Sequence, residues 1–132
     1  MKKPSKEQEK KLLTETELEL MQIIWNLGEA TVKEVIQHLP NERQLAYTSV
    51  STIIRILEKK EIVTSRKGNG NSYIYTPQIM KSEYEQASLG HLLKNVFSDT
   101  PSSLIRTLVD TMDLSKSDLV EIKKILLERL DP

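Results

Sequence analysis

Residues 46–60 read AYTSVSTIIRILEKK, and this stretch decides the fold around which the rest of the chain is organised. Apolar side chains recur here every three or four residues, which predicts an amphipathic helix from about Tyr47 to Lys60. The stripe that faces the core consists of Val50, Ile53, Ile54 and Leu57. The opposite face carries short hydroxyl side chains near its start and long cations near its end, namely Thr48, Ser51, Thr52, Arg55 and Lys59.

Two shorter helices are predicted before this one, and each opens with a capping box. In this motif a hydroxyl side chain and a carboxylate three residues later accept hydrogen bonds from each other's backbone amides. The first helix begins with Thr14 and Glu17 and stops near Gly28, because glycine readily adopts a left-handed C-cap. The second begins with Thr31 and Glu34, and we expect the Pro-Asn pair that follows to end it.

A β-hairpin is predicted after the long helix. Two short runs of β-branched and aromatic residues, 62–66 and 72–76, flank a glycine- and asparagine-rich turn at 67–71. We interpret Tyr73 and Tyr75, which alternate along the second run, as packing residues. Three short helices followed by a hairpin are typical of a winged helix-turn-helix domain.

The sequence therefore predicts a mainly α protein of the α+β class in three parts. Residues 1–12 are rich in lysine and glutamate and are expected to form a flexible tail. Residues 13–80 form the winged-helix domain, and residues 81–132 form a helical domain with three apolar stripes. Pro101 suits the first turn of the middle helix of that domain, and Ser115 suits the cap of the last one.

Three thin helices of this length cannot easily enclose a core of their own. The apolar surface of residues 81–132 therefore predicts burial against a second copy of the chain, as a homodimer. The candidate dimerisation residues are Leu92, Val96, Leu104, Leu108, Leu119, Ile122, Leu126 and Leu130.

Composition argues against several classes of function. The chain has no cysteine, which excludes disulfides and thiolate chemistry. Its two histidines, His38 and His91, have no partner at metal-ligand spacing, so we expect no metal, no cofactor and no catalytic residue. No apolar run is long enough to span a membrane, and the basic start lacks the apolar segment of a signal peptide. We therefore expect a cytoplasmic protein that is not an enzyme and has no membrane partner.

Double-stranded DNA is the partner that the predicted elements favour. The net charge is zero, yet residues 45–67 hold five Lys and Arg against two Glu. A major groove accepts a helix whose hydroxyls and arginine reach base edges, with Tyr47 and Ser49 as further candidate contacts. Arg66 and Lys67 would bind phosphates from the hairpin. For any single residue an ordinary solvated surface remains an alternative, and for the whole domain so does a protein–protein interaction module.

Several segments resemble the penicillinase-repressor family, which includes the BlaI and MecI repressors and the copper-responsive CopY proteins. These segments are LTETELELM at 13–21, AYTSVST at 46–52, ILEKK at 56–60, and the hairpin segments RKG at 66–68 and YIY at 73–75. The resemblance implies a winged-helix domain and a three-helix dimerisation domain. It also implies a homodimer that occupies a palindromic operator and blocks transcription.

Two departures from the family pattern leave the inducing signal open. Copper-responsive members sense metal through paired cysteines, and this chain has none. The β-lactam-responsive members are cleaved by a protease at an Asn-Phe bond, and the corresponding position here is the bond between Thr107 and Leu108. Whether an upstream protease or another signal ends repression is therefore not determined by the sequence, and neither are the regulated genes.

Overall fold

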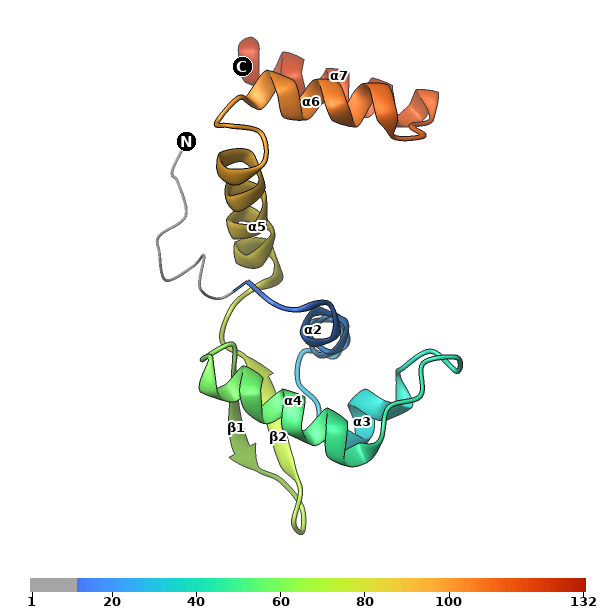
Figure 1. Cartoon of the computed structure of the whole chain (residues 1–132), viewed down its shortest axis with the longest axis vertical. Coiled ribbons are helices and arrows are strands. Elements are labelled where there is room, and N and C mark those ends of the chain that lie inside the picture. The colour runs from blue at the N-terminus through green and yellow to red at the C-terminus, as the bar shows by residue number, and fades with distance from the viewer. Residues whose placement is uncertain (1–11) are drawn as a thin grey trace. The chain divides into compact units, whose positions relative to one another are not determined.

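The computed structural model describes residues 12–132, so the predicted tail lies outside the described residues except for Leu12. The elements in chain order are α2 (Glu15–Leu27), α3 (Val32–Gln37), α4 (Tyr47–Lys59), β1 (Val63–Lys67), β2 (Tyr73–Pro77), α5 (Lys81–Asn95), α6 (Pro101–Thr111) and α7 (Lys116–Leu130) (Figure 1). They group into two compact units, Met1–Gly90 and His91–Pro132. The predicted boundary after residue 80 marks the start of α5, whereas the two units divide later, within that helix.

Helices α2 and α3 begin at the capping boxes that the sequence predicts. The Thr14 hydroxyl accepts from the Glu17 amide at 3.2 Å, and the Glu17 carboxylate accepts from the Thr14 amide at 2.9 Å. Thr31 and Glu34 repeat the arrangement, and these bonds hold the pKa of Glu34 below its ordinary value. Gly28 ends α2 with φ +84°, as predicted. Helix α3 ends at Gln37, earlier than predicted, because a turn follows there.

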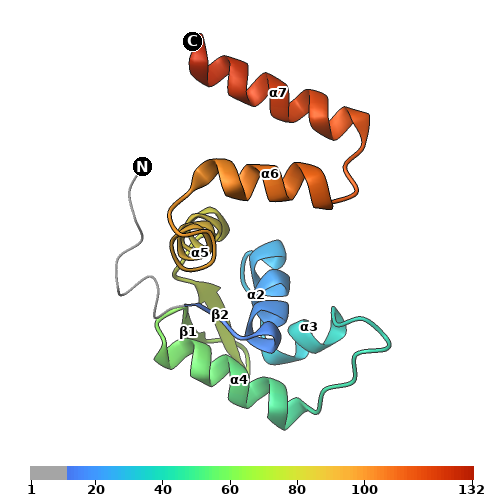
Figure 2. The same ribbon diagram turned by 45° about the horizontal axis from the view of Figure 1, so that its top comes forward.

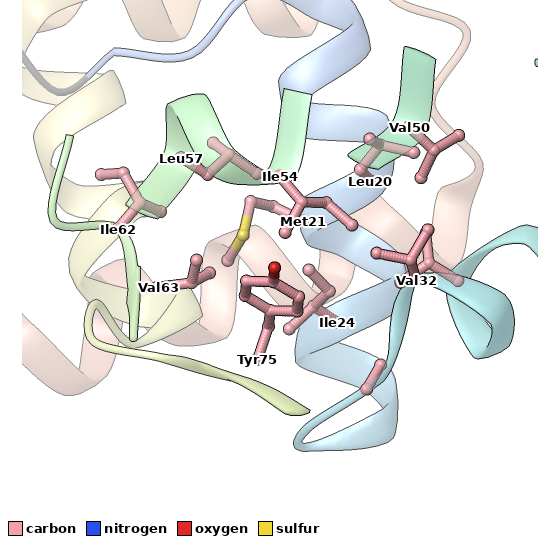
Figure 3. Close-up of a cluster of buried hydrophobic side chains, with 12 residues drawn as sticks. Leu20, Met21, Ile24, Val32, Val50, Ile54, Leu57, Ile62, Val63 and Tyr75 are labelled. Carbon is pink, nitrogen blue, oxygen red and sulfur yellow. The ribbon is translucent and has the colours of Figure 1, made fainter. Parts of the chain in front are cut away.

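The core of the first unit lies between α2, α3, α4 and the hairpin (Figure 3). Fully buried side chains come from α2, from α4 and from the start of β1. The ring of Tyr75, from β2, lies among them beside Val63 and Ile24 (Figure 3). Tyr75 also exchanges backbone hydrogen bonds of 2.8 and 3.0 Å with Ala30, so the hairpin is tied to the turn between α2 and α3. The buried apolar surface thus fixes α4 and the hairpin relative to each other.

Strands β1 and β2 pair antiparallel and start and end one residue later than predicted (Figures 1 and 2). Their turn uses Gly70 at φ +63°, a conformation that glycine adopts without a Cβ penalty. Tyr75 is buried, as predicted for a packing residue. The same prediction is wrong for Tyr73, whose side chain is 50% exposed because it lies nearer the tip of the hairpin, where the core has ended.

The start of α5 is attached to the first unit through Trp25 and Tyr84. The Trp25 indole donates to the Ile79 carbonyl at 2.9 Å, and its ring lies 5.6 Å from the ring of Tyr84. The Tyr84 hydroxyl accepts from the Leu13 amide at 3.1 Å. These contacts join the end of the hairpin, the segment before α2 and the first turn of α5.

The second unit contains α6 and α7 (Figure 2). Helix α6 begins with Pro101 and α7 with a capping box of Ser115 and Asp118, as predicted. Neither helix has a buried residue. Between α5 and α6, Ser98 and Asp99 both have a positive φ, which is uncommon for residues other than glycine. None of the helices in the described part of the chain is long and apolar enough to cross a membrane.

Candidate nucleic-acid interface

Helix α4 turns its polar face to solvent. Its core-facing side chains, Val50, Ile54 and Leu57, are fully buried, and Ile53 is half-buried. The predicted contact residues of this helix are exposed, apart from the half-buried Ser51: Tyr47, Thr48, Ser49, Thr52, Arg55 and Lys59. By helical spacing, Thr48, Thr52, Arg55 and Lys59 share the side opposite the core, while Tyr47 and Ser49 lie on opposite flanks of it.

The hydroxyl of Thr52 is already used within the helix. It donates to the Thr48 carbonyl at 2.8 Å. Since a hydroxyl has one proton, Thr52 is left with acceptor lone pairs and a methyl group for any external contact. Such a residue suits an amino group or a methyl group on a base edge.

Two contacts hold the C-terminal half of α4 in place. On one side the Lys60 ammonium lies 2.8 Å from the carboxylate of Glu17, whose side chain is only 7% exposed. On the other side the Ser65 hydroxyl of β1 donates to the Glu58 carboxylate. Helix α4 is thus bonded to α2 and to the hairpin as well as packed between them.

The ion pair sets the charge state of Glu17. Burial raises the pKa of this carboxyl, whereas hydrogen bonds from Lys60 and Thr14 and the positive charge of Lys60 lower it. The lowering effects together exceed the effect of burial, so the pKa lies below its ordinary value. Glu17 is therefore a charged, buried anchor for the end of α4 at neutral pH.

The register of the hairpin divides its side chains between two faces. Residues directly opposite each other in an antiparallel pair share a face, and the faces alternate along each strand. We call the face that contains Ser65 and Tyr75 the α4-facing face, since Ser65 bonds α4 and Tyr75 enters the core. Lys67 and Tyr73 are paired and lie on this same face, towards the tip.

Arg66 lies on the other face of the hairpin, which we call the outer face. It is opposite Ile74, and its guanidinium lies 2.6 Å from the Glu29 carboxylate and 3.3 Å from the Thr76 hydroxyl. The two cations predicted to act together in the wing, Arg66 and Lys67, therefore point to opposite sides.

Cations of the first unit differ in whether they are paired. Arg43 bonds Glu19 at 2.9 Å, in addition to the pairs of Lys60 and Arg66. In contrast, Arg55, Lys59 and Lys67 form no ion pair with another residue in the range 12–132. Among the predicted contact residues, the cations without an ion pair thus lie on α4 and on the α4-facing face of the hairpin.

Sequence reasoning missed two exposed side chains at this surface. Tyr73 could have been placed beside Lys67 by pairing the two strands across their turn. Ile56 is 40% exposed on α4, although its residue type suggests burial. Its position, four residues after Thr52 and three before Lys59, puts it on the exposed side of the helix.

The predicted dimerisation residues lie on the last three helices, except Val96, which lies in the turn after α5. Five of them are exposed in the single chain: Leu92, Val96, Leu119, Leu126 and Leu130. The other three, Leu104, Leu108 and Ile122, are partly buried. Exposure of so many leucines leaves a large apolar surface without a partner in one copy of the chain.

Three helices and a hairpin that share one core, with the third helix exposed along a polar face, define a winged helix-turn-helix protein. Comparison with known proteins identifies the particular family. The family model described as penicillinase repressor matches residues 13–128, and the chain therefore belongs to the penicillinase repressor family. Members of this family are transcriptional regulators and not enzymes.

Individual relatives are distant but nearly full length. The penicillinase repressor of Bacillus licheniformis is 27% identical over 116 residues, which cover 88% of this chain and 90% of that protein. The methicillin resistance regulatory protein MecI of Mammaliicoccus sciuri is 25% identical over 114 residues, covering 86% and 92%. A solved structure of a MarR mutant from E. coli complexed with operator DNA has a TM-score of 0.47 at 13% identity, covering 95% of this chain and 80% of that one.

Proposed function

We propose that this chain is a transcriptional repressor that binds a palindromic DNA operator as a homodimer. The observation that carries the proposal is that three exposed cations, on α4 and on the α4-facing face of the hairpin, have no ion pair within residues 12–132. Arg55 and Lys59 on α4 and Lys67 on the hairpin lie on surfaces that adjoin each other, and they lie among exposed hydroxyl groups. DNA requires this combination, because cations neutralise phosphates and hydroxyls contact phosphates and base edges.

In the proposed complex α4 lies in the major groove. Thr48 and Thr52, in its first two turns, are placed for base contacts, and their methyl groups suit thymine. Arg55, one turn further, would pair with guanine. Tyr47 and Ser49, at the entry of the helix, and Lys59, at its end, would contact the backbone. Lys67 would bind a phosphate from the wing.

The homodimer is supported by the apolar surface of α5, α6 and α7. Each of these helices has exposed apolar side chains, such as Leu92 on α5, Ile105 on α6 and Leu126 on α7, and a twofold contact with a second copy would explain their exposure. Two α4 helices related by that axis would contact half-sites about 34 Å apart, or about 10 bp, or a multiple of this spacing. An operator occupied in this way is blocked for transcription, and we place this action in the cytoplasm.

The proposal is tested by selecting binders from a library of duplexes with a random 30-bp centre, using the full-length protein. We expect an enriched palindrome, bound at least 1000-fold more tightly than an unselected duplex. Thr48→Ala should weaken binding to the enriched palindrome, because Thr48 is placed for a base contact. Thr64→Ala, on the outer face of the hairpin, is its matched control and should leave the enriched sequence and its affinity unchanged. Failure to enrich any duplex would refute the proposal and favour a protein–protein interaction module.

A further inference from the structure

The wing of this protein has two faces, each with one exposed cation, and only the cation of the outer face is bonded to a carboxylate. Towards the tip, the α4-facing face carries Lys67 and Tyr73, which are opposite each other in the hairpin and both exposed. The outer face carries Arg66, which is bonded to Glu29 and Thr76. A contact surface built from α4 and the wing can include the first face only, since the second faces away from α4.

We infer that Tyr73 and Lys67 together hold one DNA strand against the wing through its phosphates, whereas Arg66 is a positioning residue that ties the wing to Glu29. The inference rests on the proposed function, because it names which wing residues touch the DNA backbone. It differs from a uniform basic wing, in which both cations would bind phosphate.

The first support is the position of Tyr73 beyond the core. Tyr73 and Tyr75 lie two residues apart on β2 and therefore on one face. Tyr75 is 5% exposed and packs in the core, but Tyr73 is 50% exposed on the same side. An aromatic side chain held half in solvent beside a lysine has a hydroxyl that can donate to a phosphate oxygen.

The second support is the grouping of polar side chains around the Tyr75 hydroxyl. Burial raises the pKa of Tyr75, Glu58 and the two tyrosines Tyr47 and Tyr73 raise it further, and Arg55 lowers it. The groups that act on the Tyr75 hydroxyl thus come from both elements: Tyr47 and Arg55 belong to α4, and Tyr73 belongs to the hairpin.

Tyr47 and Arg55 belong to a stripe of side chains along one side of α4. Tyr47, Ser51 and Arg55 are each four residues apart, and Glu58, three residues after Arg55, bonds Ser65 of the wing. This stripe is thus the side of α4 that borders the hairpin. In the proposed complex α4 fills the major groove. The DNA strand between that groove and the wing would then pass over Tyr47, Arg55 and Tyr73.

The third support is the pairing of Arg66. Its guanidinium is 2.6 Å from Glu29, which directly precedes Ala30, the residue that pairs with Tyr75. The pair therefore joins the outer face of the hairpin to the turn between α2 and α3. Both side chains are about half exposed, at 54% and 48%, but the charge of the guanidinium is already balanced by a carboxylate. We therefore expect Arg66 to release no counterion when DNA binds.

The test measures affinity and its salt dependence by fluorescence anisotropy, with the duplex enriched in the selection described above. Tyr73→Phe and Tyr73→Ala should each weaken binding about tenfold, since the hydroxyl bond to a charged group is lost in both. The slope of log affinity against log salt should stay unchanged for both, because a phenol releases no counterion. Lys67→Ala should weaken binding and lower the magnitude of that slope by about one.

Arg66→Met should weaken binding but leave the salt slope unchanged. The double variant Arg66→Glu with Glu29→Arg, which exchanges the two charges of the ion pair, should restore affinity. If Arg66 instead bound a phosphate, Arg66→Met would lower the slope by about one and the exchange would not restore affinity. Tyr73→Phe with wild-type affinity would refute the role of the Tyr73 hydroxyl. Either result, obtained while the wild-type protein still binds the duplex, overturns this inference alone. A wild-type protein that enriches no duplex would overturn the proposed function instead.

Discussion

At the scale of single residues, Glu17 has the most uncommon environment in the described chain. It is an acidic residue in a position where apolar residues surround it, at the first turn of α2. It accepts from the Thr14 amide and from Lys60, so one carboxylate both caps its own helix and anchors the end of α4. A buried carboxylate that is bonded on both oxygens stabilises the fold only while it is ionised.

Glu17 makes the stability of the first unit depend on pH. The folded-state pKa of Glu17 is lowered, so its stabilising contribution is present above the ordinary pKa of about 4.5 and is lost as the pH falls through the folded value. Lys60→Met should destabilise the protein at pH 7 by about 2 kcal/mol, since it leaves a buried carboxylate without its cation. The difference from wild type should shrink as the pH falls through the lowered folded-state pKa of Glu17, because a protonated Glu17 no longer needs its cation.

Urea unfolding at pH 7 and pH 3.5, at one protein concentration, measures both effects. Arg43→Met is the matched control, because the Arg43 pair with Glu19 is exposed and should contribute less than about 1 kcal/mol. A Lys60→Met variant with wild-type stability at pH 7 would show that the pair does not anchor α4.

At the scale of elements, α4 and the wing should contribute differently to DNA binding. Arg55→Ala should weaken binding to the enriched duplex about tenfold or more but change binding to an unselected duplex little, since a base contact carries specificity. Lys67→Ala should weaken both by a similar factor, because a phosphate contact is independent of sequence. Anisotropy titrations with both duplexes measure the two ratios. If Arg55→Ala lowered the affinity for both duplexes by the same factor, Arg55 would contact the DNA backbone and not a base.

The elements themselves could be predicted closely from the sequence. Capping boxes at Thr14, Thr31 and Ser115 mark helix starts through contacts between residues three apart, which are local and therefore readable. The apolar stripe of α4 identified its buried side for the same reason. A sequence pattern predicts the structure well wherever the residues in contact are also close in sequence.

Contacts between distant segments could not be predicted in this way. The burial of Glu17 depends on Lys60, and the neutralisation of Arg66 depends on Glu29, and neither partner is close in sequence. Tyr73 and Tyr75 have the same residue type and the same face, so only the extent of the core distinguishes the exposed one from the buried one. The site therefore differs from its sequence-based prediction mainly in which cations are available.

At the scale of the whole molecule, the second unit should set the strength of binding through dimerisation. Leu126→Asp or Leu119→Asp places a charge on an apolar surface of α7 and should yield monomers. A monomer binds only one half-site, whereas in the dimer the second half-site is engaged at a high effective concentration. We therefore expect operator affinity to fall by about 100-fold or more.

Sedimentation velocity measures the mass, and anisotropy with the enriched duplex measures the affinity. Ser117→Asp is the matched control, because it adds the same charge at an exposed polar position in the first turn of α7, where a negative charge suits the helix dipole. An unaltered mass for both leucine variants would show that the dimer contact lies elsewhere.

Three ion pairs in the described part of the first unit affect how strongly chromosomal DNA competes with an operator for the protein. Arg43, Lys60 and Arg66 are each balanced by a glutamate of the same chain, so these three charges attract DNA of arbitrary sequence less than free cations would. Random genomic sites compete with an operator through that attraction. Each pair therefore reduces this competition. We expect fewer copies of the protein to be needed to keep an operator occupied than if the three cations were unpaired.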